Sequence, residues 1–313
     1  MSKILLAIEG FEPLSWLERF RALSGAKHEV KLWPDIDGAS DFDYACVWRP
    51  WHGLLKDFPK LKAIFNLGAG VDHLLQDEKL PSAPVVRIVD PDLTIRMVGY
   101  VVMHAHLHHR QMKLYGEQSE ERIWKDHNEP PPGTVNVGLM GMGVMGQASA
   151  KGLIASGFPV LGWSRAKKDV PGVEMFSGEE GLKAFLARTN ILVCLLPLTP
   201  ETKGILDYNL FKQLAREPIL PAVINAGRGG EQVEDDIVRA LEDGTLAGAS
   251  LDVFEKEPLP AASRLWGHPK VYITPHNAAS SDPRALVANI LSQIENFENG
   301  RPLENVVDRK LGY

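Results

Sequence analysis

Short apolar runs alternate with helix-like stretches through the first third of the chain. The apolar runs cover residues 4–8, 28–33, 44–48, 63–68 and 84–89. Runs of this length, separated by segments long enough for a helix, predict parallel strands joined by crossover helices. We therefore expect an α/β domain on a parallel sheet at the start of the chain.

A second series of the same kind follows after an interruption. Residues 99–119 are predicted to form one long helix, and the charged, proline-rich residues 120–133 predict a loop or boundary. The later apolar runs are residues 135–140, 159–164, 191–196, 222–226, 248–253 and 271–275. Such runs fit strands that are buried on both faces of a parallel sheet. Six of them predict a doubly wound dinucleotide-binding domain.

The length of the chain agrees with two domains. A chain of 313 residues exceeds the usual size of a single hydrophobic core. A last helix, near residues 283–299, follows the second series and could pack back on the first domain.

Composition and charge exclude several classes of partner. The net charge is −6 without a basic block, which argues against nucleic acid or an anionic membrane as the main partner, although small anions need only local positive charge. Cys46 and Cys194 lie in apolar runs, which predicts buried thiols in a reducing compartment. No stretch approaches the about 20 apolar residues of a membrane span, and the N-terminal SKILLAIEG is too short for a signal-peptide core. We expect a soluble, cytoplasmic protein.

A glycine pattern follows the first strand of the second series. Gly141, Gly143 and Gly146 stand in the order G-x-G-x-x-G between a predicted strand and a predicted helix, which is the context a dinucleotide site needs. Gly141 would permit the tight turn, Gly143 would let the backbone approach a pyrophosphate, and Gly146 would let the helix pack on the strand. The helix N-terminus would then face the anion. The alternative is a glycine-rich turn without a ligand.

The end of the next strand indicates which cofactor is preferred. An NAD site usually has an acidic residue here for the ribose 2′-hydroxyl. This chain has Ser164 and Arg165, followed by Lys167 and Lys168. Cations suit a 2′-phosphate, so we predict NADPH over NADH. A solvated basic loop is the alternative.

Three later strand ends carry candidate chemistry. Arg228 stands among glycines after one run, Glu257 precedes Pro258 after the next, and His276 follows Pro275 after the last. A guanidinium offers paired donors to a carboxylate, and the flanking glycines would keep the loop open to a small substrate. A histidine oriented by a carboxylate that favours imidazolium makes a general acid for carbonyl reduction.

Each of these residues also has an alternative without chemistry. Arg228 could form a surface bridge with Glu231 or Glu234, Glu257 could cap a helix, and His276 could be a satisfied loop histidine. Their joint occurrence at successive strand ends after a dinucleotide loop favours the catalytic interpretation.

Five motifs together resemble the D-isomer-specific 2-hydroxyacid dehydrogenase family along the whole chain. They are GLMGMGVMG (138–146), LLPLTPETKGIL (195–206), NAGRGG (225–230), LDVFEKEP (251–258) and ITPHNAA (273–279). The resemblance implies that Arg228 binds substrate, that Glu257 tunes His276, and that His276 is the acid/base.

The resemblance also implies an architecture and a cofactor site. It implies two Rossmann-like or flavodoxin-like doubly wound domains with the active site in the cleft between them, and a homodimer formed largely through the cofactor domain. Residues 1–98 with 286–313 would form a discontinuous substrate-binding domain, and residues 99–285 the NAD(P)-binding domain. The implied cofactor-binding residues are Gly141, Met142, Gly143, Val144, Met145, Gly146, Ser164, Arg165, Leu196, Pro197, Thr202, Ala226, Gly227 and Asp252.

Within the family, the sequence is most similar to the A-type bacterial glyoxylate/hydroxypyruvate reductases. The shared segments are VWRP (47–50), NLGAGVDHLL (66–75), GWSR (162–165), PGVEMFSG (171–178) and LWGHPKVYITPH (265–276). This similarity implies that the Ala69 and Gly70 amides bind the substrate carboxylate as an anion nest, and that Trp48 and Arg49 lie near the substrate. Relatives commonly have histidine in place of Arg49, and an extra cation there would favour a second carboxylate or a more polar substrate.

Other chemistry-bearing residues are predicted to have structural roles. His104 and His108 share a helix face, but no nearby acid or cysteine completes a metal site, and the chemistry needs no metal. Trp124 is either an anchor for a partner subunit or loop packing.

These observations predict NADPH-dependent reduction of small 2-keto acids, glyoxylate to glycolate and hydroxypyruvate to D-glycerate, with NADH as a possible second cofactor. The same chemistry on a bulkier 2-keto acid stays open, as does a non-catalytic NAD(P)-sensing module. Oxidation of 3-phosphoglycerate is disfavoured, because the chain has no room for an added regulatory domain and lacks the acidic residue that favours NAD.

Overall fold

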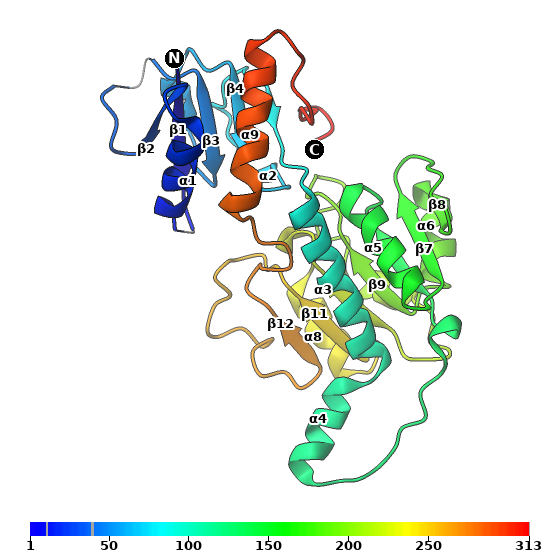
Figure 1. Ribbon diagram of the computed structural model, residues 1–313. Coiled ribbons are helices and arrows are strands. Elements are labelled where there is room, and N and C mark those ends of the chain that lie inside the picture. Colours follow the sequence, from blue (N-terminus) through cyan, green and yellow to red (C-terminus); the bar gives the residue numbers. More distant parts are fainter. Residues whose placement is uncertain (11, 39–40, 313) are drawn as a thin grey trace. The chain divides into compact units, whose positions relative to one another are not determined.

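The structure is a computed structural model that describes residues 1–10, 12–38 and 41–312 (Figure 1). The chain divides into two compact units. Unit 1 comprises Met1–Leu93 and Ser281–Tyr313, and unit 2 comprises Thr94–Ser280. The boundaries expected from the sequence, after residues 98 and 285, lie a few residues further along the chain.

Unit 1 is built on a parallel sheet. The described strands pair in the order β2-β1-β3-β4-β5. Their bounds are β1 Ser2–Ile8, β2 His28–Leu32, β3 Tyr44–Trp48, β4 Ala63–Asn66 and β5 Val85–Val86. The central strands β1, β3 and β4 are apolar at nearly every position and almost wholly buried, as strands covered on both faces must be.

Helices from the first part of the chain and one from its end complete unit 1. They are α1 Leu14–Ser24, η1 Leu55–Asp57, α2 Asp72–Leu75 and α9 Pro283–Glu298. Asp282 caps α9 by accepting the amide of Arg284 at 2.8 Å, and Pro283 occupies the first turn, where a missing N–H costs nothing. The apolar face of α9 is buried, and the helix packs beside α1 (Figure 1). The last helix therefore returns to the first sheet.

Unit 2 is built on a larger parallel sheet. Its described strands pair in the order β12-β11-β10-β9-β6-β7-β8. Their bounds are β6 Val137–Met140, β7 Val160–Ser164, β8 Glu174–Ser177, β9 Ile191–Cys194, β10 Ala222–Asn225, β11 Gly248–Leu251 and β12 Val271–Ile273. Because the strand order reverses beside β6, the end of β6 is the topological switch point where doubly wound sheets bind ligands.

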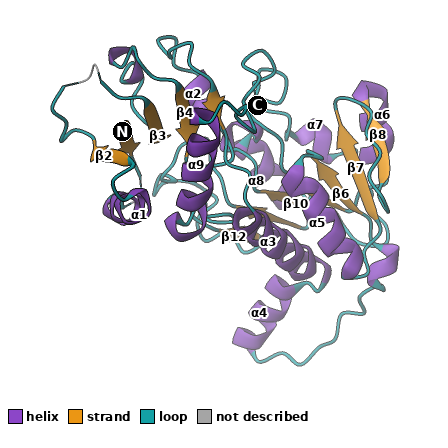
Figure 2. Ribbon diagram, turned by 45° about the horizontal axis from the view of Figure 1, so that its top comes forward, coloured by secondary structure: helices purple, strands orange, loops and turns teal. Residues whose placement is uncertain are grey.

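Helices cover both faces of this second sheet, and α4 projects away from it (Figure 2). The helical segments that follow unit 1 along the chain are α3 Pro91–His109, α4 Met112–Glu121, η2 Pro132–Thr134, α5 Val144–Ala155, α6 Gly178–Leu186, α7 Tyr208–Phe211, η3 Gly229–Glu231 and α8 Glu234–Glu242. Neighbouring strand residues such as Leu192 and Val193 belong to different hydrophobic clusters, one packed on α6, α7 and α8 and the other on α3 and α5. The two doubly wound parallel sheets confirm the predicted fold class.

Two details differ from the prediction. The helix expected over residues 99–119 is two helices, because Gln111 has a left-handed φ of 52° that ends the hydrogen-bond pattern of α3. The sheet also gains the edge strand β8, whose side chains are exposed or half-buried and so form no apolar run.

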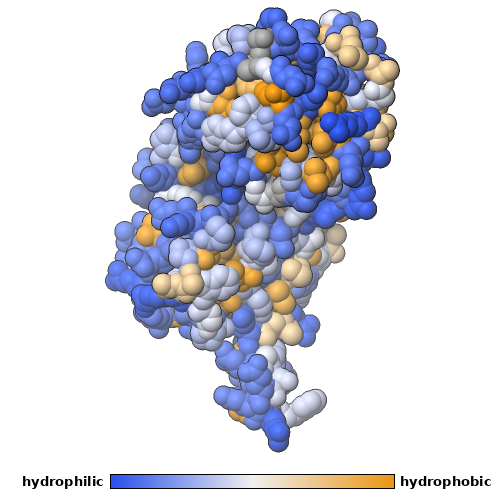
Figure 3. Space-filling view, turned by 90° about the vertical axis from the view of Figure 1, so that its left-hand side faces the viewer, coloured by the Kyte–Doolittle hydropathy of each residue, from blue (hydrophilic) through white to orange (hydrophobic). Residues whose placement is uncertain are grey.

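The surface is mainly polar. The face drawn in Figure 3 shows hydrophilic residues over most of its area, with hydrophobic residues in patches among them. No helix in the described part of the chain is both long enough and apolar enough to span a bilayer.

Candidate active site

Parallel pairing brings the predicted catalytic residues of unit 2 to one edge of the sheet. Strands β10, β11 and β12 are parallel neighbours, so their carboxyl ends meet at the same edge. Arg228 follows β10, Glu257 follows β11 and His276 follows β12. Ligands of doubly wound sheets bind outside this edge.

The glycine loop joins β6 to α5 at the same edge. Gly141 has φ 102°, and a Cβ on it would lie 2.5 Å from the carbonyl oxygen of Leu195. A Cβ on Gly146 would lie 2.0 Å from the carbonyl oxygen of Gly141. Gly143, which precedes α5, is different: a Cβ there would meet no described atom within 4 Å. Packing therefore requires glycine at Gly141 and Gly146, whereas the backbone at Gly143 is open.

The start of α5 can hold an anion. Gly143 is the N-cap residue of α5 and has no side chain that could cap the helix. The first amides of α5 therefore remain available to bind an anion. The helix dipole adds partial positive charge at this end. Val144 is exposed in this first turn, whereas Met142 is buried and Met145 packs against the hydrophobic core. The loop thus fits the pyrophosphate of a dinucleotide.

Cations lie at the end of β7, beside the glycine loop. Ser164 is buried and its hydroxyl donates to the carbonyl of Ala166 at 2.7 Å. Lys168 donates from Nζ to the carbonyl oxygen of Met142 at 2.9 Å, which ties the two loops together. Arg165 is exposed. A hydrogen bond from the Thr199 side chain lowers the pKa of Glu201, and the positive charge of Arg165 lowers it further. The predicted cations Arg165, Lys167 and Lys168 are therefore exposed, and Lys168 is bonded to the glycine loop.

The loop after β9 is held by one threonine. The Thr202 hydroxyl donates to the Pro197 carbonyl at 2.7 Å and accepts the Thr199 amide at 2.8 Å. Leu196, at the start of this loop, is 9% exposed. Thr202 therefore shapes the segment that contains Leu196 and Pro197.

The glycines around Arg228 serve packing, which corrects the expectation that they keep the loop open. A Cβ on Gly227 would lie 2.5 Å from Oε2 of Glu231, and one on Gly229 would lie 1.9 Å from the backbone of Phe254. The Arg228 guanidinium donates from Nη1 to the carbonyl of Gly227 at 2.7 Å. The missing side chains admit other parts of the protein rather than a substrate.

Glu231 lies beneath this loop and was not predicted to do so. Its side chain is fully buried, so any bridge between Glu231 and Arg228 lies below the surface rather than on the surface, where the sequence had suggested it. Oε2 accepts the backbone amide of Arg228 at 3.0 Å and the thiol of Cys194 at 3.2 Å. Burial and this neighbouring carboxylate raise the pKa of Cys194 well above its usual value. The carboxylate of Glu231 therefore fixes the backbone from which Arg228 projects.

Glu257 and His276 form a hydrogen-bonded pair. Nδ1 of His276 lies 2.9 Å from Oε2 and 3.1 Å from Oε1 of Glu257. The carboxylate can only accept, so Nδ1 is the protonated donor and Nε2 is the ring atom that can transfer a proton. The two side chains are 28% and 18% exposed, which leaves the ring accessible from solvent.

Asp252 is directed toward the histidine turn. It is 1% exposed, its Oδ1 accepts the Thr274 hydroxyl at 2.7 Å and the Asn277 amide at 2.9 Å, and its Oδ2 accepts the Ala278 amide at 3.0 Å. Its predicted cofactor contact stays a prediction; within the protein it organises the loop that carries His276.

The predicted substrate residues of unit 1 follow two neighbouring strands. Trp48 ends β3, and its ring packs on Gly68, where a Cβ would lie 2.2 Å from Cζ3. Buried Asn66 donates from Nδ2 to the carbonyls of Gly68 and Gly70, each at 2.8 Å. Asn66 was not predicted; it fixes the turn that contains the Ala69 and Gly70 amides.

Arg49 continues directly from Trp48. It has a left-handed φ of 45°, and its guanidinium carbon lies 5.7 Å from the centre of the Trp48 ring. The side chain is exposed at the carboxyl end of β3. An exposed cation therefore stands beside the turn that contains Ala69 and Gly70.

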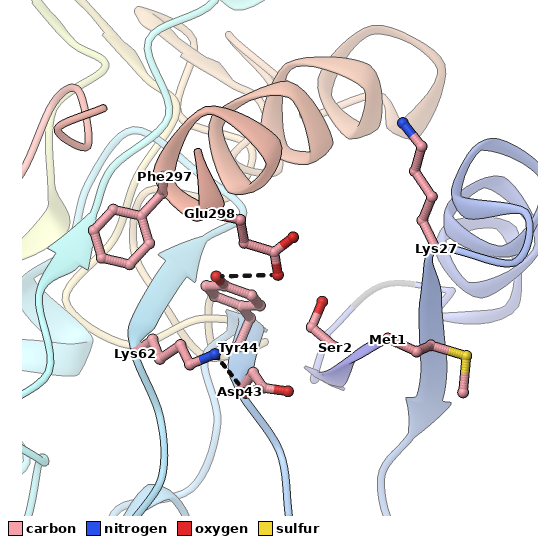
Figure 4. Close-up of a pocket in the computed structure, with 8 residues that line it drawn as sticks. All are labelled: Met1, Ser2, Lys27, Asp43, Tyr44, Lys62, Phe297 and Glu298. Atoms are coloured by element: carbon pink, nitrogen blue, oxygen red, sulfur yellow. Dashed lines mark hydrogen bonds and ion pairs between the residues drawn. The ribbon is translucent and has the colours of Figure 1, made fainter. Parts of the chain in front are cut away.

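A separate pocket of unit 1 lies at the opposite, amino edge of its sheet (Figure 4). Its volume is about 490 Å³. Figure 4 shows two polar pairs across it, Lys62 with Asp43 at 2.9 Å and the Tyr44 hydroxyl with Glu298 at 3.5 Å. These groups satisfy one another, and the predicted site residues of unit 1 follow the other ends of the strands.

The histidines of α3 bind a serine. Nδ1 of His104 and Nε2 of His108 both lie within 2.8 Å of the Ser250 hydroxyl on β11. Among the residues that the structure describes, no group of His, Cys, Asp or Glu is arranged to hold a metal.

Comparison with known proteins identifies the family of the chain. The model of the D-isomer specific 2-hydroxyacid dehydrogenase NAD-binding domain matches residues 102–278. The chain is 42% identical to glyoxylate/hydroxypyruvate reductase A of Escherichia fergusonii over 97% of each chain.

Solved structures with the same fold cover the whole chain. The NADPH-dependent glyoxylate/hydroxypyruvate reductase of Sinorhizobium meliloti, in complex with NADP and sulfate, is 47% identical, with a TM-score of 0.95 and 100% of each chain covered. A probable 2-hydroxyacid dehydrogenase of Rhizobium etli, in complex with NADP, HEPES and L(+)-tartaric acid, is 43% identical, with a TM-score of 0.93 and the same coverage. The chain therefore belongs to the D-isomer specific 2-hydroxyacid dehydrogenase family of oxidoreductases.

Proposed function

We propose that the protein reduces small 2-keto acids with NADPH, converting glyoxylate to glycolate and hydroxypyruvate to D-glycerate. The observation that carries this proposal is the Glu257–His276 pair, 2.9 Å apart, at the same sheet edge as an open glycine loop. The relatives from Escherichia fergusonii and Sinorhizobium meliloti, named as glyoxylate/hydroxypyruvate reductases, support the choice of substrates.

His276 acts as the general acid in this proposal. When bound, the cofactor supplies the hydride that adds to C2 of the keto acid. The carbonyl oxygen gains negative charge as this happens, and Nε2 of His276 gives it a proton. Glu257 holds Nδ1 and stabilises the positive charge of the ring before that transfer. Proton transfer by a positioned group contributes about 10²–10⁴-fold to rate.

Arg228 and the turn of Ala69 and Gly70 hold the substrate carboxylate. A guanidinium gives two parallel donors to a carboxylate, and consecutive backbone amides form an anion-binding nest. The burial of Glu231 under Arg228 and the bonds from Asn66 within the turn keep both sets of donors in place. Arg49, beside Trp48, would favour keto acids with a polar or anionic group beyond C2.

Arg165 makes the site prefer NADPH. Its exposed guanidinium follows β7 at the position where NAD sites have an acidic residue. The structures from Sinorhizobium meliloti and Rhizobium etli hold NADP, which supports the same preference here.

The assembly and location are part of the same proposal. We expect a cytoplasmic homodimer, formed largely through unit 2. The side chain of Trp124, between α4 and β6, is fully exposed and available to a second copy.

A kinetic panel tests the proposed function. Loss of reduced-nicotinamide absorbance is measured with NADPH or NADH against glyoxylate, hydroxypyruvate, pyruvate and phenylpyruvate. Fast turnover with NADPH and the two small polar acids supports the proposal. Turnover of phenylpyruvate alone would replace the substrate, and NADPH binding without any turnover would favour a sensing module.

The acid role has its own variant. His276→Gln should lower kcat by about 10²–10⁴-fold without changing the melting temperature. His268→Gln, in the loop before β12, is the matched control and should keep normal turnover. Near-normal kcat in His276→Gln would remove the acid role.

A further inference from the structure

The turn that carries His276 has an unusual backbone. His276 has φ 53°, which lies in the left-handed region that non-glycine residues rarely adopt. Such a conformation is strained and persists where surrounding contacts determine it. The contacts that hold this turn therefore decide where the imidazole points.

Asp252 provides those contacts from the end of β11. Its carbonyl oxygen accepts the His276 amide at 2.8 Å, and its carboxylate accepts the amides of Asn277 and Ala278 at 2.9 and 3.0 Å. Three consecutive backbone amides thus end on one residue. Asp252 is buried, so water does not compete for these hydrogen bonds. The bonds are therefore stronger than they would be at the surface.

Two hydroxyl groups continue the chain of bonds away from the site. Thr274 gives its proton to Oδ1 of Asp252 at 2.7 Å, so its oxygen can accept the proton of the Tyr100 hydroxyl, 3.0 Å away. Burial raises the pKa of Tyr100, so its hydroxyl stays protonated and remains a donor. Tyr100 is 7% exposed on α3.

We propose that Tyr100 and Thr274 are positioning residues for His276, acting through the Asp252 carboxylate. Tyr100 orients the Thr274 hydroxyl, Thr274 fixes the rotamer of Asp252, and Asp252 fixes the turn at 276–278. The inference rests on the proposed acid role of His276, and it assigns a function to two residues on which no substrate or cofactor contact is placed.

Variants of Thr274 separate the hydroxyl from the rest of the side chain. Thr274→Val keeps the shape but removes the donor, so Asp252 is free to rotate. We expect kcat to fall at least about tenfold, since small displacements of a catalytic group are costly. The KM for glyoxylate should change less than about threefold. Thr274→Ser restores the hydroxyl and should restore kcat, and Tyr100→Phe should give a smaller loss.

Two readouts distinguish positioning from a loss of folded protein. Turnover is expressed per NADPH-binding site, which removes any contribution from unfolded molecules. The solvent deuterium isotope effect on kcat should rise in Thr274→Val, because proton transfer from a misplaced acid becomes slower. Unchanged kcat per site, or a loss in Thr274→Ser equal to that in Thr274→Val, would overturn the proposal.

Hydrogen exchange tests the same bonds without cofactor or substrate. The amides of His276, Asn277 and Ala278 should exchange faster in Thr274→Val than in the unchanged protein or in Thr274→Ser. This result stands even if the wild-type protein turns over no keto acid, so failure of the proposed function is separable. Equal exchange in all three proteins would contradict the role of Thr274.

Discussion

Some glycines of the site are required by the protein itself and one is not. A Cβ would lie 2.0 Å from backbone at Gly146 and 1.9 Å from backbone at Gly229, so packing explains both positions without a ligand. At Gly143 a Cβ would meet no described atom within 4 Å, and φ is −80°, which any residue adopts. Packing therefore does not require glycine at position 143, as expected if the pyrophosphate of the proposed cofactor passes there.

Gly143→Ala should therefore separate stability from binding. Stability should stay the same or rise by about 0.4–1 kcal/mol, because alanine has fewer unfolded conformations. NADPH affinity should fall at least about tenfold, or 1.4 kcal/mol, because the methyl group would occupy the path of the pyrophosphate. Melting temperature and NADPH titration by fluorescence measure the two effects.

A second open glycine provides the control. Gly99 lies within α3, and a Cβ there also meets no described atom within 4 Å. Gly99→Ala should bind NADPH normally. If Gly143→Ala binds NADPH as tightly as Gly99→Ala does, the glycine loop does not hold the cofactor as proposed.

Arg165 is the residue whose charge should choose between cofactors. Arg165→Asp should weaken NADPH by about ten- to hundred-fold, since a hydrogen bond to a charged group contributes roughly 1.5–3 kcal/mol. NADH, without a 2′-phosphate, should lose much less. Arg188→Asp makes the same charge change at a surface pair with Glu174 and should leave the preference intact. Equal losses for both cofactors in Arg165→Asp would argue against the assignment.

At the scale of the element, buried strands were predictable and their edges were not. The apolar runs of β6, β9 and β10 are fully buried, so pattern and structure coincide there. Strand β8 lies at an edge with half-exposed side chains, which removes the signal. The break after α3 depends on one left-handed residue, Gln111, and a sequence pattern does not encode such a residue unless it is glycine or asparagine.

The histidine face of α3 is packed on the sheet. His104 and His108 bracket the Ser250 hydroxyl at 2.7 and 2.8 Å, and both rings meet the edge of Tyr272. The His104 ring also contacts the Tyr100 ring, with ring centres 4.1 Å apart and planes tilted by 37°. The Ser250 hydroxyl can accept from one ring nitrogen and donate to the other, and burial disfavours the charged form of both imidazoles.

This pair should make stability fall with acid. Burial lowers the pKa of His104 to about 4 and that of His108 to about 3, from an ordinary value of 6.5. Below pH 6.5 these two histidines bind protons in the unfolded chain but stay neutral in the folded protein. The free energy of unfolding is therefore highest above pH 6.5 and falls progressively between pH 6.5 and about pH 3, the lower of the two folded-state pKa values. Each proton contributes a slope of about 1.4 kcal/mol per pH unit.

Urea unfolding between pH 7 and pH 5 measures that slope. The double variant His104→Gln with His108→Gln keeps hydrogen-bonding groups at both positions, but these groups do not titrate. The dependence of its unfolding free energy on pH should therefore correspond to nearly two fewer protons taken up on unfolding. His52→Gln, at an exposed position, should keep the original slope. An unchanged slope in the double variant would show that these histidines do not control the acid sensitivity.

At the scale of the molecule, the sequence was enough to predict the fold and family but not the support beneath the site. Arg228, Glu257 and His276 could be proposed as one site because parallel strands place their following loops at one edge. Glu231, Asn66 and Tyr100 act through contacts that depend on packing, such as the space left by Gly227 for the Glu231 carboxylate. A single sequence shows that such residues are present but not which residues they contact in the fold.

The two units also have separate hydrophobic clusters, and the proposed cofactor residues all belong to unit 2. Binding of NADP⁺ at 100 times its Kd stabilises the folded form that binds it by about 2.7 kcal/mol. If the units unfold independently, the slowest-exchanging amides of unit 2 should gain about 100-fold protection, and those of β3 and β4 in unit 1 should gain little.

Hydrogen exchange with peptide resolution measures this protection. The Gly143→Ala variant at the same NADP⁺ concentration should show a smaller gain in unit 2. Equal protection in both units would mean that the chain unfolds as one cooperative body, so that cofactor binding stabilises the substrate-binding sheet as well.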